Sequence, residues 1–190
     1  MVKKHRSLVI LPLAALILAG LACNFQKGRP EPPATPVPVT TEAVQSLQEN
    51  LQAAATQVKS GGQVTLTVTE SQATSILALE VQSQDTPLLQ DPQVLLRDGQ
   101  VQVFGNVQQG DMTAPLQLVL TVQVNNQGQP SFSVVSGYLG PLPLPEAMLN
   151  ELSARLDSAL TSQIRSEAGS IALDSITIAD GVMTITGHPR

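Results

Sequence analysis

Residues 94–103 read VLLRDGQVQV, with Asp98-Gly99 between two stretches that carry apolar residues at alternate positions. Asp-Gly flanked in this way is a strong signal for a β-hairpin, because both central residues of a type I′ turn need a positive φ. A two-residue turn would place Leu96 opposite Val101, and the alternate apolar residues would share one side of the sheet. This stretch therefore predicts an antiparallel hairpin with one apolar face.

The same pattern returns 82 residues later at Asp180-Gly181, again between apolar residues at alternate positions. In both copies a glycine follows the aspartate by seven residues, at Gly105 and at Gly187. The similarity covers about twelve residues each time. It predicts two equivalent hairpins and not a duplicated domain.

The spacing of apolar residues predicts the elements around these hairpins. Apolar positions three and four apart indicate helices over 41–59 and from Glu146 to a stop at Gly169. The capping box Thr69-Glu70-Ser71-Gln72 marks the start of another helix. Its apolar face is expected at Ala73, Ile76, Leu77 and Val81. Alternation of apolar and polar residues predicts further strands over 63–69, 116–124 and 132–138.

The predicted order of elements is α-β-α-β-β-β-β-α-β-β. Because hairpins dominate, we expect an α+β fold, in which a mainly antiparallel meander sheet has three helices packed on its apolar face. A domain of this size can form its core from aliphatic side chains without a disulfide.

The N-terminus has the features of an export signal. Basic residues at positions 3–6 precede a 15-residue apolar run over 8–22, which is short for a membrane-spanning helix. The run ends in Ala19-Gly20-Leu21-Ala22-Cys23, which resembles the bacterial lipobox, although Gly20 replaces the commoner leucine. An ordinary signal peptide with a stray cysteine, or an uncleaved anchor, is the alternative. Since the single cysteine of the chain lies where lipidation requires it, we predict cleavage between Ala22 and Cys23 and lipidation of Cys23.

Three segments are therefore expected: a lipoprotein signal peptide (1–22), a lipidated cysteine with a proline-rich tether (23–40), and a single α+β domain (41–190). The tether has five prolines within 24–40, which favour polyproline II at about 3.1 Å per residue. The chain after cleavage has seven basic and 15 acidic residues, a net charge of −8. An acidic body is repelled by an anionic membrane surface, so the lipid and not a basic patch would hold the protein there.

Composition excludes several classes of function. The chain has four aromatic residues, one cysteine and two histidines, and charged residues make up 13% of it. This disfavours nucleic-acid binding, disulfide scaffolds and His/Cys metal sites. Among the titratable groups, Asp98 and Asp180 belong to turns, Glu70 begins a helix, and His188 lies near the C-terminus. We therefore expect no enzyme activity, no cofactor and no metal.

Two apolar faces are the remaining candidates for a functional surface. One lies on the long strand predicted over 116–124. The other lies on the last helix, where apolar residues recur at every fourth position. The candidate ligand-facing residues are Leu116, Leu118, Leu120, Val122, Leu152, Leu156 and Leu160. These faces could line a groove for an acyl chain, or they could seal an ordinary core.

Several short motifs occur together within residues 63–187. They are Thr67-Val68-Thr69-Glu70, Leu96-Arg97-Asp98-Gly99 with Gly105, Gly140-Pro141-Leu142-Pro143, and Ile176-Thr177-Ile178 with Asp180-Gly181 and Gly187. The combination resembles the YpmS-like family of bacterial extracytoplasmic proteins and is more distantly similar to the LmeA-like envelope proteins. The resemblance implies a cell-envelope protein without an established enzyme activity. Its distant branch implies a tubular lipid-binding fold, as in lipid-transfer proteins, and it implies no particular ligand residues.

Two functions are consistent with the sequence. The first is a non-catalytic module that binds or transfers a lipid or another hydrophobic ligand. The second is a structural or protein-interaction lipoprotein of the envelope, with a filled core and no small ligand. Both place an exported protein, lipid-anchored through Cys23, on the outer face of the bacterial cytoplasmic membrane or in the cell envelope.

Overall fold

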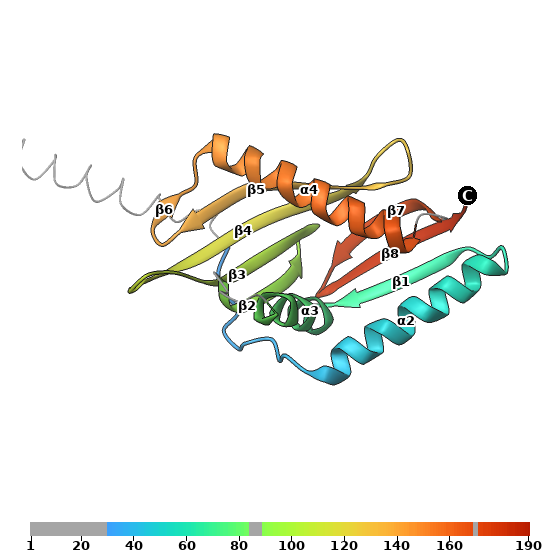
Figure 1. Cartoon of the computed structure of the whole chain (residues 1–190), viewed down its shortest axis with the longest axis horizontal. Helices are drawn as coiled ribbons and strands as arrows, with labels where there is room; N and C mark the ends of the chain where they lie inside the picture. The colour runs from blue at the N-terminus through green and yellow to red at the C-terminus, as the bar shows by residue number, and fades with distance from the viewer. Residues whose placement is uncertain (1–29, 84–88, 169–170) are drawn as a thin grey trace, which may run out of the picture. The chain divides into compact units, whose positions relative to one another are not determined.

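The computed structural model describes residues 30–83, 89–168 and 171–190 (Figure 1). Pro32–Arg190 form one compact unit, and the description below concerns that unit. Residues 32–40 of the predicted tether are therefore part of it. The predicted signal peptide (1–22) and the predicted lipidation site Cys23 lie outside the described residues.

The described residues form an α+β fold with three helices and antiparallel strands, which confirms the predicted class and order, with the short β6 in addition. The strands divide into two sheets and not one, because β1 pairs with the second hairpin and not with β2. The elements are α2 (Thr41–Lys59), β1 (Val64–Thr69), α3 (Glu70–Gln82), β2 (Leu89–Arg97), β3 (Gln100–Gln109), β4 (Met112–Val124), β5 (Pro130–Leu139), β6 (Leu142–Pro143), α4 (Glu146–Ala168), β7 (Ile171–Ala179) and β8 (Val182–Pro189). One sheet has the order β1-β8-β7 and the other β2-β3-β4-β5-β6. The short β6 lies in the proline-rich crossover before α4.

Both predicted hairpins are present with the predicted register. Asp98 and Gly99 have φ values of 54° and 73°, and Asp180 and Gly181 have φ values of 50° and 82°. Two successive residues with positive φ are what a type I′ turn requires, and glycine meets this requirement without steric cost. Leu96 pairs with Val101 in the first hairpin, as expected from the sequence.

Helix α3 lies along the free edge of β2, as Figure 1 shows. The Leu96 N–H donates to Oε1 of Glu70 at 2.8 Å, and the Val94 N–H donates to Oγ1 of Thr74 at 2.9 Å. Residues four apart on a helix are separated by about 6 Å, close to the roughly 6.6 Å between alternate residues of a strand. One stripe of a helix can therefore satisfy successive unpaired N–H groups of an edge strand. The next strand position in this series is Pro92, which has no N–H.

Helix α4 closes the opposite edge in the same way. The Val134 N–H donates to Oγ of Ser153 at 2.8 Å, and the Phe132 N–H donates to Oδ1 of Asp157 at 2.8 Å. The next strand position is again a proline, Pro130. Helices α3 and α4 thus flank the five-stranded sheet, α3 along β2 and α4 along the part of β5 that the two-residue β6 leaves unpaired. This placement leaves the middle of its inner apolar face without a helix directly against it.

The buried face of α3 differs from the predicted one. Thr74 and Ser75 are completely buried, whereas Ile76, which was predicted to face the core, is 42% exposed. The reason is that hydrogen bonds set the rotation of the helix: Thr74 bonds to β2, and Oγ of Ser75 accepts the Thr40 N–H at 3.1 Å. The predicted capping box is present, with Thr69 Oγ1 accepting the Gln72 N–H.

Candidate functional site

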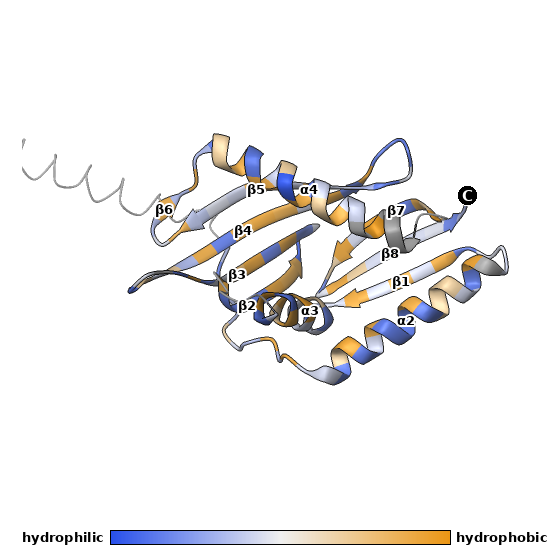
Figure 2. Cartoon of the chain, viewed as in Figure 1, coloured by the Kyte–Doolittle hydropathy of each residue, from blue (hydrophilic) through white to orange (hydrophobic). Residues whose placement is uncertain are grey.

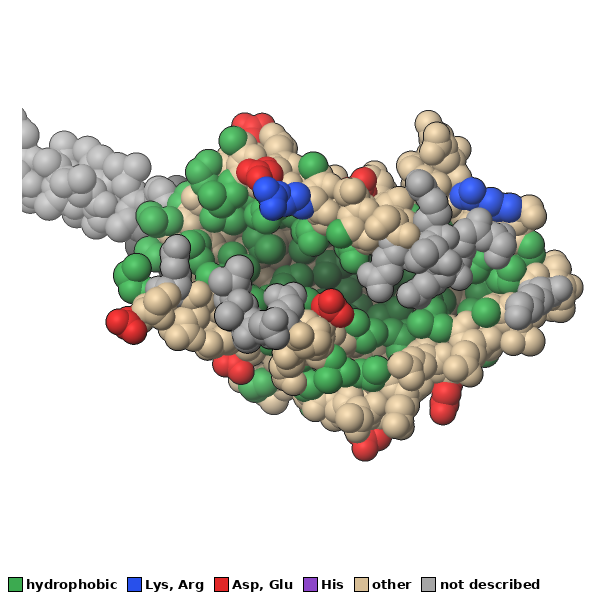
Figure 3. Space-filling view, in the orientation of Figure 1, with side chains coloured by type: hydrophobic (Ala, Val, Ile, Leu, Met, Phe, Trp, Pro, Cys, Tyr) green, Lys and Arg blue, Asp and Glu red, His purple; other side chains and the backbone are tan. Residues whose placement is uncertain are grey.

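An apolar cavity of about 330 Å3 lies between the two sheets. Strands β1, β7 and β8 and helix α2 contribute to its walls together with the ends of β4, β5 and α4. Its lining consists of Leu51, Ala54, Ala55, Val64, Leu66, Val122, Pro130, Phe132, Ile164, Ile171, Leu173, Ile176, Met183, Ile185, Thr186 and Gly187. Figure 3 shows a hollow lined by hydrophobic side chains between α4 on one side and α2 and α3 on the other.

The hollow separates two small clusters of buried residues. One cluster consists of Ala54, Val58 and Val64, and the other is built on Val94, Leu96 and Ile178. Between them, most of the cavity-lining side chains are only partly buried. Figure 2 shows that hydrophobic residues recur along β3, β4 and β7 between the helices. The apolar faces therefore do not pack into one continuous filled core among the described residues.

The candidate residues of the long strand lie on the inner face of the five-stranded sheet. Val122 lines the cavity, and Leu120 is buried at 7% exposure. Leu116 and Leu118 are partly buried, and Leu116 also borders a second pocket beside residues 32–39. Cδ2 of Leu118 lies 2.9 Å from the position that a Cβ would take at Gly137.

The candidate residues of the last helix lie beside the stripe that closes the β5 edge. Leu152, Leu156 and Leu160 are each partly buried, and Ile164, four residues further on, lines the cavity. The row formed by Leu152, Leu156 and Leu160 is displaced by one residue from Ser153 and Asp157, which bond to β5. Since Ile164, the next residue of this row, lines the cavity, the row faces the hollow and not the sheet edge. Both candidate faces thus border the same space, with Val122 and Ile164 reaching the cavity itself.

The opposite wall of the cavity contains none of the predicted ligand-facing residues. Ile171, Leu173, Ile176, Met183 and Ile185, from the second hairpin, line the cavity there. In the sequence their alternation predicts a hairpin, and it does not by itself indicate a ligand-facing wall. One signal in the sequence could have identified them. Both hairpins have an apolar side, and the three helices have too few apolar residues to cover both.

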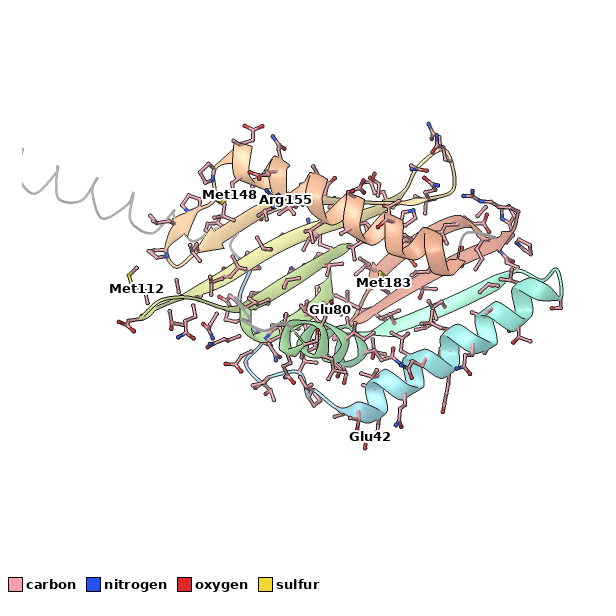
Figure 4. All side chains as sticks on the ribbon, viewed as in Figure 1. Glu42, Glu80, Met112, Met148, Arg155 and Met183 are labelled. Carbon is pink, nitrogen blue, oxygen red and sulfur yellow. The ribbon has the colours of Figure 1, made fainter. Side chains whose placement is uncertain are left out.

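The cavity is uncharged over its described lining, in which Thr186 is the one side chain with a polar group. Its volume is near the lower end of the range of about 300–1,000 Å3 that is typical of ligand pockets. Figure 4 shows Glu80 on α3 and Arg155 on α4, the helices on either side of the hollow. Arg155 forms an ion pair with Glu151 at 2.7 Å. The uncharged lining of the cavity suits an apolar chain better than a polar substrate.

A polar pocket forms where the two Asp-Gly turns meet. Oε1 of Glu70 accepts the Leu96 N–H and lies 3.5 Å from Nε of Arg97. The Gly181 N–H donates to the Leu96 carbonyl at 2.9 Å, and the Glu70 N–H donates to the Gly181 carbonyl at 3.2 Å. From the sequence, the negative charge of Glu70 is expected to interact only with the dipole of its helix. The structure shows that it also joins α3 to both hairpins.

The other histidine and carboxylate side chains that the structure describes form no candidate catalytic or metal site. Nδ1 of His188 lies 2.7 Å from Oδ1 of Asp174, and both side chains are substantially exposed. Within the described ranges, no group of three or more His, Cys, Asp and Glu side chains is placed to hold a metal ion. None of the described helices is both long enough and apolar enough to cross a bilayer.

The last residues of the predicted tether lie against the domain. The Val37 N–H donates to Oε1 of Gln93 at 2.5 Å, and the Ser71 hydroxyl donates to the Pro38 carbonyl at 3.0 Å. Pro32, Pro33 and Pro36 border a pocket of about 610 Å3 with residues of α3, β2, β3 and β4. The free part of the tether is therefore shorter than the proline content suggested.

No protein-family model matches the chain, and no curated protein sequence matches it significantly.

Proposed function

We propose that this protein is an exported lipoprotein that binds or transfers a lipid or another hydrophobic ligand without catalysing a reaction. The observation that supports this proposal most directly is the uncharged 330 Å3 cavity between two apolar sheet faces. An acyl chain is the ligand whose chemistry fits such a lining. The proposal includes membership of the YpmS-like family, anchoring through Cys23, and a location on the outer face of the cytoplasmic membrane or in the cell envelope.

The physical basis of the binding is the unburied apolar area in the hollow. Burial of apolar surface contributes about 25 cal/mol per Å2, so a chain that covers these side chains gains affinity without any polar contact. Helices α3 and α4 are held at the sheet edges by hydrogen bonds from Glu70, Thr74, Ser153 and Asp157. They therefore cannot move over the inner face to fill the hollow without breaking those bonds.

Native mass spectrometry of the domain 32–190 tests whether a ligand is bound. This fragment keeps residues 32–40, which pack against the sheet. We expect co-purifying molecules that are released by organic extraction and identified as lipids. An empty domain that also takes up no fluorescent fatty acid would refute the proposal and would favour the structural or protein-interaction lipoprotein.

A substitution of a cavity-lining residue distinguishes an open hollow from a filled core. Val122→Trp should reduce the binding of a fluorescent fatty acid, because the larger side chain occupies the cavity that Val122 lines. In a hollow the unfolding free energy should change by less than about 1 kcal/mol, whereas overpacking a filled core costs about 1–3 kcal/mol. Thr121→Trp is the matched control, since its side chain points to the other face of β4. Equal effects of the two substitutions on binding would contradict a ligand site at Val122.

The anchor is tested separately by mass spectrometry of the mature N-terminus. We expect a diacylglyceryl-modified Cys23 as the first residue. Cleavage at another site, or an unmodified cysteine in membrane-extracted protein, would refute the lipoprotein part of the proposal. The cavity experiment would remain valid in that case, because it uses a fragment that lacks Cys23.

A further inference from the structure

One end of the domain exposes a group of large apolar side chains. Met112 is 72% exposed, Leu142 68%, Met148 47% and Leu139 38%. We call these four residues the apolar tip. Figure 4 shows Met112 at the outer end of the β3–β4 hairpin and Met148 near the start of α4, and Figure 3 shows hydrophobic side chains along this end of the molecule. Large apolar side chains exposed together at one end of a domain mark a surface that meets a protein or a membrane.

The backbone fixes the parts of the apolar tip relative to one another. Leu142 pairs with Leu139, and Leu139 pairs with Leu116 on β4. The Gly140 N–H donates to the Pro115 carbonyl at 2.7 Å, which ties the β5–β6 turn to the β3–β4 hairpin. Leu139, Leu142 and the β3–β4 hairpin that carries Met112 are thus held together by paired strands.

The inner face of β4 runs from the apolar tip to the cavity. Residues at even positions of β4 share its inner face, because side chains alternate along a strand. Met112, Leu116, Leu118 and Leu120 therefore lead along one face to Val122, which lines the cavity. An apolar chain could follow this face from the exposed end of the domain into the hollow.

The chain enters the domain at the same end. Pro32 and Pro33 border one pocket together with Asn106, Pro115 and Leu116. Pro32 follows Cys23 by nine positions, and even a fully extended chain of that length spans only about 30 Å. A lipid on Cys23 would hold this end close to the bilayer, whereas the β4–β5 turn lies about 40 Å away along the 13-residue β4.

The charges beside the apolar tip indicate which kind of bilayer it fits. Its flanking charged residues, Asp111 in the β3–β4 turn and Glu146 at the start of α4, are both acidic. Acidic side chains are repelled by anionic headgroups and tolerated by zwitterionic ones. The fitting surface is therefore one of net-neutral phospholipids.

We propose that the apolar tip inserts into the headgroup region of a net-neutral bilayer and opens the inner face of β4 toward its acyl chains. This proposal rests on the proposed anchor at Cys23, which brings the apolar tip to the membrane. It assigns to the four exposed residues a role in contacting the bilayer and receiving the ligand. It also gives the domain an orientation, with the β4–β5 turn directed away from the membrane.

Site-specific fluorescence tests the proposal on the full-length mature protein in phosphatidylcholine vesicles. The chain has one cysteine, so a lipidated Cys23 leaves each newly introduced thiol as the unique labelling site. Met112→Cys and Leu142→Cys report on the apolar tip, and Gln127→Cys in the β4–β5 turn is the matched control. Each variant carries an NBD label, and brominated phosphatidylcholine serves as the quencher. Mass spectrometry of every sample records whether Cys23 is lipidated.

We expect both tip labels to lose roughly half or more of their emission, since interfacial apolar groups lie about 5–10 Å into the headgroup and acyl boundary. The label at residue 127 should be unaffected. Unquenched tip labels on a lipidated protein would overturn the proposal while leaving the anchor intact. Emission that depends on protein concentration and not on bromine would also overturn it, because it would identify a second copy of the chain as the occupant. Tip quenching without lipidation would support the membrane contact and refute only the anchor.

Discussion

Thr74→Val tests directly whether α3 closes the edge of the five-stranded sheet. Thr74 is completely buried, and its Oγ1 accepts the Val94 N–H at 2.9 Å. Valine has the same shape and a similar helix propensity, so the substitution removes little beyond the hydroxyl, which accepts from the Val94 N–H and donates to the Val94 carbonyl at 3.4 Å. Val94 itself is only 4% exposed, which leaves its N–H without water. A buried donor without a partner costs about 1–3 kcal/mol.

Urea denaturation of the domain 32–190, followed by circular dichroism, measures this cost. For a domain of this size, 1 kcal/mol corresponds to about 2–4 °C in Tm, so thermal melting should show a decrease of roughly 2–12 °C. The matched control is Thr56→Val on α2, where the hydroxyl donates to the Gln52 carbonyl at 2.9 Å but is exposed. Water replaces that bond, so we expect a change within about 0.5 kcal/mol.

The opposite edge provides a second, independent measurement. Ser153→Ala removes the acceptor of the Val134 N–H and should also destabilise the domain by about 1–3 kcal/mol. Strands β2 and β5 are three strand spacings apart, about 14 Å, so the two effects should add within about 0.5 kcal/mol.

The reasoning is refuted if Thr74→Val is no more destabilising than Thr56→Val at an unchanged m-value.

Three further predictions concern the turns, the sheet and the exposed end. Gly137→Ala should destabilise the domain by about 1–3 kcal/mol in urea titration, because its Cβ would lie 2.7 Å from Cδ1 of Leu144 and 2.9 Å from Cδ2 of Leu118. Gly62→Ala is its control, since a Cβ there meets its nearest atom at 3.5 Å, and similar losses for both would contradict this packing. Gly99→Ala should cost about 1–2 kcal/mol in thermal melting through its φ of 73° alone, because a Cβ there meets no atom within 4 Å; an unchanged Tm would argue against the type I′ turn. Leu142→Asp should change the unfolding free energy by less than about 0.5 kcal/mol, since the side chain is 68% exposed. It should nevertheless slow the transfer of fluorescent lipid from vesicles, and an unchanged transfer rate would count against the apolar tip.

Local signals predicted the order of the elements because each depends on a few neighbouring residues. The Asp98-Gly99 and Asp180-Gly181 turns and the cap at Thr69 are determined within four residues, and all three are present. The pairing of β1 with β8 could not be predicted in this way. Val64 pairs with Gly187 across more than a hundred residues, and alternation along a strand does not specify which strand lies beside it.

The candidate site was only partly predictable for a related reason. Val122 and the stripe of α4 followed from periodicity, but the wall formed by Ile176 and Met183 depends on how the two sheets face each other. The exposure of Ile76 likewise depends on Thr74, whose hydroxyl is directed at β2 and not at its own helix. A polar side chain that closes a sheet edge looks, in sequence, like one that faces solvent.

The closed edges have a consequence for how this protein behaves at high local concentration. Proteins with an exposed row of strand N–H groups tend to pair edge to edge and form fibrils. Here two N–H groups on β2, and two on the part of β5 that β6 does not cover, are already bonded to α3 or α4, and the next outward-facing position is Pro92 on β2 or Pro130 on β5. A second chain finds no continuous ladder to extend at these positions. The domain can therefore keep an apolar hollow open without offering these edges of its five-stranded sheet as a template for polymerisation.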